Sequence, residues 1–240
     1  LADAGAAIER DKASSWLWLD RGRMYLSGDR KEEALADFDM AIKLEPDYFL
    51  PYVYRAGLYE QTGQDEAAAA DYRAILRLEP DYWYAHESLG AVAFRLGLWP
   101  EAAASFKSTF AKAQDRYEYA ILAGLALVRS GKPVEARTWA ASIAPTMDRE
   151  KDGIYWLMLR LIQDQNDQSS ELELKLQALK SLDTKTAMLF YLSEYWLFRG
   201  KPEIATKYLL LAREMRRYDC LEYRLLQPEL KRLGVPESRG

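Results

Sequence analysis

Few side chains of this sequence have the type and spacing needed for catalysis or metal binding. His86 is the only histidine, and no second histidine follows His86-Glu87 at the spacing of a zinc-binding helix. The single cysteine, Cys220, has no histidine or cysteine beside it, and no glycine-rich loop could cradle a phosphate. We interpret His86 as a packed or half-buried ring, with a ligand contact as the alternative, and Cys220 as a small apolar residue. The sequence therefore predicts no enzyme, no catalytic residue, no metal and no cofactor.

Charge and composition exclude further classes of protein. The formal net charge is −4, which gives no basic field of the kind that attracts nucleic acid. Acidic pairs such as Glu32-Glu33, and Asp37 with Asp39, are spaced as on a solvated helix face. No apolar run is as long as a membrane span. Because strong helix formers dominate and β-branched runs are scarce, we predict an all-α protein.

A period of 34 residues organises the chain. The string LEPDY occurs at Leu44–Tyr48 and again at Leu78–Tyr82, and the residues around both copies match at the same offset. A fixed period of this size indicates stacked units, none of which can bury its apolar face alone. The starts fall near 15, 49, 83, 117, 152 and 186, which predicts about six units.

Each unit has the pattern of two antiparallel helices. In the second unit, Tyr52, Ala56 and Tyr59 lie on one helix face, and Gly63 stands where a helix end often needs positive φ. Pro80 cannot continue the second helix. A small residue recurs where the paired helices should cross, and we expect all five copies to be buried: Ala34, Ala68, Ala102, Ala136 and Ala205.

These positions resemble the pattern W-x2-L-G-x2-Y…A-x3-F…P of the tetratricopeptide repeat (TPR) family. Arg21 and Arg55 stand where the family has Leu, and Gln114 replaces the proline of the third repeat. The first repeat matches at seven positions: Trp18, Gly22, Tyr25, Ala34, Phe38, Ala41 and Pro46. The resemblance implies a right-handed α-solenoid of about six helix pairs over residues 15–219.

The two ends are expected to differ from the repeats. Residues 1–14 could be a loose tail or a short helix, and residues 220–240 a capping helix followed by a disordered tail. Leu221, Leu225 and Leu226 would cover the last repeat, and Pro228 should bend or break the helix. The fifth repeat is the most divergent, and its helices are expected to be joined by a turn at residues 164–167.

The TPR resemblance also implies a binding surface, since the first helix of each pair lines a concave groove in that family. The groove positions combine aromatic, arginine and small residues, a mixture common in peptide-binding surfaces. Some of these side chains could instead pack on neighbouring repeats. The candidate partner-binding residues are Trp16, Arg23, Tyr54, Tyr84, Glu87 and Arg95. The further groove positions of the three repeats are Leu19, Asp20, Leu26, Ser27, Leu50, Val53, Gly57, Glu60, Gln61, Ser88, Ala91 and Phe94.

A second resemblance concerns the C-terminal region. FYLSEYWLFRGKPEIATKYLLLA, followed by EYRLLQPEL, is similar to the end of bacterial TPR lipoproteins on the periplasmic side of the outer membrane. Those proteins are adaptors for proteases and envelope enzymes. The chain begins at Leu1 rather than Met, which fits either a removed targeting segment or a shortened chain. We therefore favour the bacterial periplasm or an outer-membrane lipoprotein over the cytoplasm, with a lipid anchor on a missing N-terminal segment.

Two hypotheses for function follow. The first is a non-catalytic scaffold or adaptor that binds a protein or peptide in the groove, as a monomer or a homo-oligomer, without nucleic acid. The alternative is a binding subunit of a transport system, in which six curled repeats enclose a small hydrophobic molecule among aromatic side chains.

Overall fold

The computed structural model describes residues 1–164 and 169–236, and in this part of the chain it contains 14 α-helices and no strand. Most of the turn predicted at 164–167 lies outside the described residues, and so do residues 237–240 of the predicted disordered tail. The helices are α1 Ala2–Arg10, α2 Ser15–Ser27, α3 Lys31–Leu44, α4 Phe49–Gln61, α5 Asp65–Leu78, α6 Trp83–Leu96, α7 Trp99–Lys112, α8 Tyr117–Arg129, α9 Pro133–Ile143, α10 Gly153–Asp164, α11 Ser169–Ala178, α12 Leu182–Phe198, α13 Pro202–Glu214 and α14 Leu221–Arg232.

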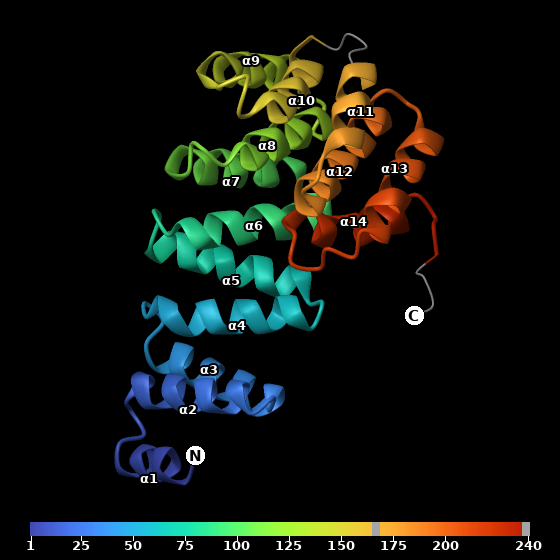
Figure 1. The fold of residues 1–240 in the computed structure, drawn as a ribbon. Helices are drawn as coiled ribbons and strands as arrows, with labels where there is room; N and C mark the ends of the chain where they lie inside the picture. The colour runs from blue at the N-terminus through green and yellow to red at the C-terminus, as the bar shows by residue number, and fades with distance from the viewer. Residues whose placement is uncertain (165–168, 237–240) are drawn as a thin grey trace. The chain divides into compact units, whose positions relative to one another are not determined.

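The helices belong to two compact units, residues 1–92 and residues 93–240, and the boundary falls within α6. In the N-terminal unit, α2 packs on α3, α4 packs on α5, and α3 joins the two pairs by packing on α4 (Figure 1). α1 covers the outer side of α2 and buries Ile8. Residues 1–14 thus contain the short helix that the sequence left open.

Small residues allow the paired helices to approach closely, as the repeat pattern predicts. The five alanines of the recurring crossing position, Ala34, Ala68, Ala102, Ala136 and Ala205, are all fully buried. Because a larger side chain at these crossings would overpack the contact, alanine fits each of them.

One turn position recurs with a left-handed backbone. Gly63, Gly97, Gly131 and Gly200 have φ between 68° and 76°, each directly after the first helix of a pair. In the first repeat the equivalent residue is Asp29, with φ of 56°. Asp tolerates this conformation better than most residues, so the turn keeps its shape without glycine.

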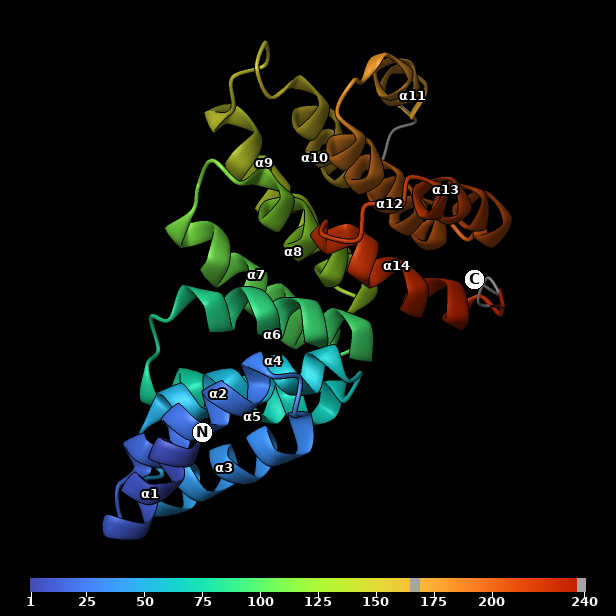
Figure 2. The same ribbon diagram turned by 60° about the horizontal axis from the view of Figure 1, so that its bottom comes forward.

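In the C-terminal unit, α7 packs on α8, α9 packs on both α8 and α10, and α12 packs on α13 (Figure 2). α14 then lies against α12 and α13, where Leu225 and Leu226 are fully buried. Of the bend or break expected at Pro228, the break does not occur, since one helix runs from Leu221 to Arg232. Glu229 and Leu230, directly after the proline, are buried and hold the second half of the helix in place.

Arg21 and Arg55, the two departures from the repeat pattern, pair with buried carboxylates. Nε and Nη2 of Arg21 donate to Asp37, both at 2.7 Å, and the same atoms of Arg55 donate to Asp71 at 2.8 and 2.6 Å. Asp37 is only 3% exposed, so its assignment to a solvated helix face was wrong. The sequence spacing placed it on one face of its helix but did not show that this face meets an arginine.

His86 takes part in a hydrogen bond that recurs in three repeats. Trp18 Nε1 donates to the carbonyl of Lys12 at 3.1 Å, and the Tyr52 hydroxyl donates to the carbonyl of Pro46 at 3.1 Å. A ring nitrogen of His86, Nε2, lies 2.8 Å from the carbonyl oxygen of Pro80. Each ring therefore reaches back six residues to fix the entry of its helix, and the half-buried His86 has a structural role.

Candidate functional site

Two adjoining hollows lie over α2, α4 and the start of α6 in the N-terminal unit. One, of about 470 Å³, is lined by Asp20, Arg23, Met24, Leu26, Ser27 and Tyr54. The other, of about 360 Å³, is lined by Leu26, Val53, Tyr54, Gly57, Leu58, Gln61, Tyr82 and Tyr84. Leu26 and Tyr54 border both hollows. The two hollows therefore form one surface, which we call the tyrosine groove.

Tyr54 stands between the two halves of the tyrosine groove. The guanidinium of Arg23 lies 5.3 Å from the centre of its ring, close enough for a cation–π contact. The same ring stacks on the buried Phe38, with centroids 5.8 Å apart. Tyr54 therefore lines the groove and also packs on the core, so removing it would disturb both.

Tyr84 forms the other wall together with Tyr82. It is 39% exposed, and its ring meets those of Tyr82 and Tyr72 edge-on at 6.2 and 6.5 Å. The Tyr72 hydroxyl donates to Glu60 at 2.7 Å, which fixes the buried ring behind the wall. Such edge-to-face contacts hold the groove tyrosines in defined orientations.

Gly57 opens the tyrosine groove between these walls. A Cβ atom added at this residue would have no neighbour within 4 Å, although Gly57 lies in the interior of α4. Glycine in a helix interior costs about 0.5–1 kcal/mol relative to alanine. Packing does not require glycine here, and its absence of a side chain leaves room in the groove.

The six predicted partner-binding residues are not all brought together. Arg23, Tyr54 and Tyr84 line the tyrosine groove. Trp16 is 57% exposed but does not border either hollow, and the half-buried Glu87 does not border them either. Arg95 belongs to the C-terminal unit, where its backbone carbonyl accepts a hydrogen bond from Arg232.

Sequence reasoning missed three residues that line the tyrosine groove: Met24, Leu58 and Tyr82. Tyr82 is the last residue of the repeated LEPDY string, outside the helix on which groove positions were sought. The repetition of that string was the available signal, because Tyr48 and Tyr82 occupy the same position in successive repeats.

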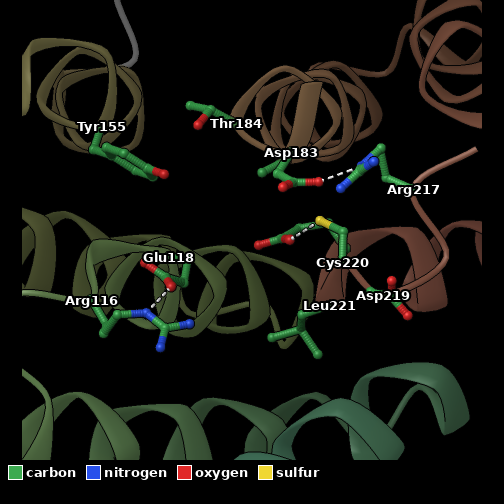
Figure 3. Close-up of a pocket in the computed structure, with 11 residues that line it drawn as sticks. Arg116, Glu118, Tyr155, Asp183, Thr184, Arg217, Asp219, Cys220 and Leu221 are labelled. Atoms are coloured by element: carbon green, nitrogen blue, oxygen red, sulfur yellow. Dashed lines mark hydrogen bonds and ion pairs between the residues drawn. The ribbon is translucent and has the colours of Figure 1, made fainter. Parts of the chain in front are cut away.

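The C-terminal unit has a polar pocket of about 270 Å³ at the start of α8, α12 and α14 (Figure 3). Nε of Arg217 donates to Asp183 at 2.5 Å, and Arg116 pairs with Glu118. The thiol of Cys220 donates to the buried Glu222 at 2.9 Å. Charged groups of this pocket are thus paired with one another, Arg116 with Glu118 two residues later and Arg217 with Asp183 of α12.

Burial raises the pKa values of Cys220 and Glu222. Desolvation, followed by the nearby Glu222 carboxylate, raises the pKa of the Cys220 thiol to about 12. Desolvation likewise raises the pKa of Glu222, which also accepts a hydrogen bond from the Tyr191 hydroxyl. The thiol is protonated at neutral pH, whereas nucleophilic chemistry needs a thiolate. This arrangement fits a structural cysteine.

A second buried network joins α8, α12 and α14. Nη1 of Arg129 lies 2.7 Å from Glu194 Oε2 and 3.2 Å from Glu229 Oε2, and both carboxylates are 1% exposed. Arg232 pairs with Glu229, and both arginines lie over the ring of Trp99, at 4.1 Å for Arg129 and 5.0 Å for Arg232. Burial and the neighbouring Glu229 raise the pKa of Glu194 to about 8.

No group of three or more potential ligand side chains that could hold a metal ion occurs among the described residues. Within the same residues, no helix is long and apolar enough to cross a bilayer. The tyrosine groove combines aromatic walls, a charged rim and open space.

Comparison with known proteins places this arrangement in a family. Tetratricopeptide repeat models match residues 17–48, 55–115 and 95–149, together a little over half of the chain. No curated protein sequence matches it significantly. The predicted resemblance to periplasmic lipoproteins, with the anchor and compartment that it implies, stays a prediction.

Solved structures of similar fold are also TPR proteins. YrrB is 16% identical with a TM-score of 0.55, over 93% of this chain and 97% of that one. A TPR protein from Parabacteroides merdae is 16% identical with a TM-score of 0.53, over 95% and 90% of the two chains. MamA of strain RS-1 is 14% identical with a TM-score of 0.51, over 86% and 96%. These likenesses show the α-solenoid fold, and the repeat models show that the chain belongs to the tetratricopeptide repeat family.

Proposed function

We propose that this protein is a non-catalytic interaction scaffold that binds a peptide segment of a partner protein in the tyrosine groove. The observation that carries the proposal is the open Gly57 between the walls formed by Tyr54 and Tyr84. A helix with a destabilising glycine that no packing contact requires is explained if the space is used by a ligand.

The chemistry of the groove suits a polypeptide. Tyrosine supplies a large contact area and a polar hydroxyl, and tyrosine and arginine are enriched among residues that dominate binding energy. Along the rim, Asp20 and Arg23 add a negative and a positive charge, and Gln61 adds a neutral hydrogen-bond donor and acceptor. This mixture favours a peptide backbone with mixed side chains over an enclosed, purely hydrophobic molecule.

The family and its structural relatives support the same class of function. TPR proteins are generally interaction scaffolds, and YrrB is described as a TPR protein with an unusual peptide-binding site. The identity of the partner is not given by these relatives, so the test must use a peptide library rather than a named protein.

Filling the groove without touching the core provides the test. Peptides would be selected from a random display library on the immobilised protein, and their affinities measured by fluorescence anisotropy for the wild type and Gly57→Leu. The leucine enters open space and favours the helix, so folding should be retained while affinity falls by at least about tenfold, or 1.4 kcal/mol.

Ala70→Leu is the matched control, because Ala70 is exposed on α5 and outside the groove lining. It adds the same kind of side chain and should leave affinity unchanged. Equal binding by wild type and Gly57→Leu, or a library that yields no binder, would contradict the proposal. The Tyr54→Ala and Tyr84→Ala variants are less clean, since both rings also pack on buried aromatic residues.

A further inference from the structure

A different groove in the C-terminal unit is lined by residues of three helices and the turn after the third. These helices, α11, α12 and α13, are labelled in Figures 1 and 2. It has a volume of about 340 Å³, and its floor is aliphatic. Leu176 and Leu189 are buried at its base, and Leu211 of α13 and Met215, directly after that helix, are half-buried. A floor of this kind accepts aliphatic or aromatic side chains from a ligand.

Two lysines border this aliphatic floor from different helices. Lys185 projects from the first part of α12 and Lys207 from α13. The carboxylate that borders the groove, Glu173, already accepts a hydrogen bond from the Tyr208 hydroxyl. Neither lysine pairs with a carboxylate among residues 1–163 and 170–236, so both ammonium groups can pair with an acidic partner.

From this pairing of charge and apolar floor we propose that the α11–α13 groove is a second docking site. Its ligand is an acidic amphipathic segment of a partner protein, with leucine-like side chains on the floor and aspartate or glutamate beside the lysines. Two ammonium groups on separate helices suit a segment that carries several carboxylates better than a molecule with one. The α11–α13 groove is in a different unit from the tyrosine groove, so this proposal does not depend on the proposed function.

Labelled synthetic peptides test this docking site directly. Three peptides share leucines at helical spacing and differ only in their polar residues, which are glutamate and aspartate, glutamine and asparagine, or lysine. Fluorescence anisotropy with the full chain should show the acidic peptide binding at least about tenfold more tightly than the neutral one. In the Lys185→Glu/Lys207→Glu variant, the acidic peptide should lose at least about tenfold and the lysine peptide should gain.

The control is Lys151→Glu/Lys201→Glu, which makes the same change in net charge at exposed lysines outside the groove lining. It should keep the wild-type preference. Leu211→Gln should weaken the acidic peptide through the floor without altering the charge preference. Equal binding of acidic and neutral peptides, or equal losses in the two charge variants, would overturn the proposal. Binding of dodecanoate that depends on Lys185 and Lys207, without peptide binding, would also overturn it in favour of a lipid ligand.

Discussion

The two units place their buried charge differently. In the N-terminal unit, Arg21–Asp37 and Arg55–Asp71 cross between the two helices of one repeat. In the C-terminal unit, Arg129 instead bridges Glu194 and Glu229, which are 65 and 100 residues away along the chain. The first arrangement fixes a repeat internally, and the second fixes helices that the repeat pattern does not relate. We call the Arg21–Asp37 and Arg55–Asp71 pairs local locks, because each joins the two helices of one repeat. We call the contacts of Arg129 with Glu194 and Glu229 the long-range lock.

Removing the long-range lock should have the largest effect. Arg129→Met would leave the buried Glu229 with less compensating charge and would remove the hydrogen-bond donor of Glu194, and breaking a buried pair in this way costs about 3–5 kcal/mol. Urea unfolding followed by circular dichroism measures the loss. Arg224→Met, at an exposed residue of α14, is the control and should change stability little. A loss no larger than the control would show that the network is not a lock.

Breaking the local lock between Arg21 and Asp37 should cost less stability, and an uncharged pair should be able to replace it. The third repeat has Leu89 and Ser105 where the first has Arg21 and Asp37, and both residues are buried. We expect Arg21→Leu alone to cost about 2–3 kcal/mol, since it strands a buried carboxylate. Adding Asp37→Ser should restore stability to within about 1 kcal/mol of the wild type.

A double-mutant cycle in urea measures this coupling between Arg21 and Asp37. Additive losses from the two single changes would show that the pair is not coupled. That result would contradict the coupling that the two short hydrogen bonds from Arg21 to Asp37 indicate.

The long-range lock should also respond to pH. Because the folded-state pKa of Glu194 is raised to about 8 from 4.5, the folded protein retains a proton that the unfolded chain loses. Its contribution to stability should therefore fall as pH rises from about 4.5 to about 8 and level off above that, with a slope of at most about 1.4 kcal/mol per pH unit. Glu194→Gln should flatten this part of the stability profile, measured by urea unfolding at each pH. An unchanged profile in the variant would contradict the assignment.

The smallest effect concerns the open groove of the N-terminal unit. Gly57→Ala should raise the free energy of unfolding by about 0.5–1 kcal/mol, since alanine favours the helix and its Cβ meets nothing. Gly22→Ala should instead destabilise, because its Cβ would lie 2.6 Å from the buried Phe38 ring. Thermal unfolding of both variants distinguishes a glycine kept for space from one kept for packing. A loss of stability in Gly57→Ala would show hidden packing at the groove.

The sequence predicted the helix pairs well because each repeat signals its own crossing and its own turn. Ala68 and Gly63, for example, have one structural role each and recur at fixed spacing. The Arg21–Asp37 lock had a readable signal too, since its spacing recurs at Arg55 and Asp71, and both partners are replaced together in the third repeat. The bridge from Arg129 to Glu194 and Glu229 had none, because no repeat relates these residues. For the groove, the repeat register found Tyr54 and Gly57 but not Tyr82, which stands just before its helix.

The contacts of α14 have a consequence for how the chain is made. Nη2 of Arg232 reaches back to the carbonyls of Phe94 and Arg95, and the bond to Phe94 spans 138 residues in sequence. Helix pairs with local contacts can form as they leave the ribosome, whereas contacts of long sequence separation form more slowly. The C-terminal unit therefore closes only after α14 has been synthesised. Until then the surfaces of α12 and α13 that α14 covers are open to chaperones, which gives translation speed a part in the yield of folded protein.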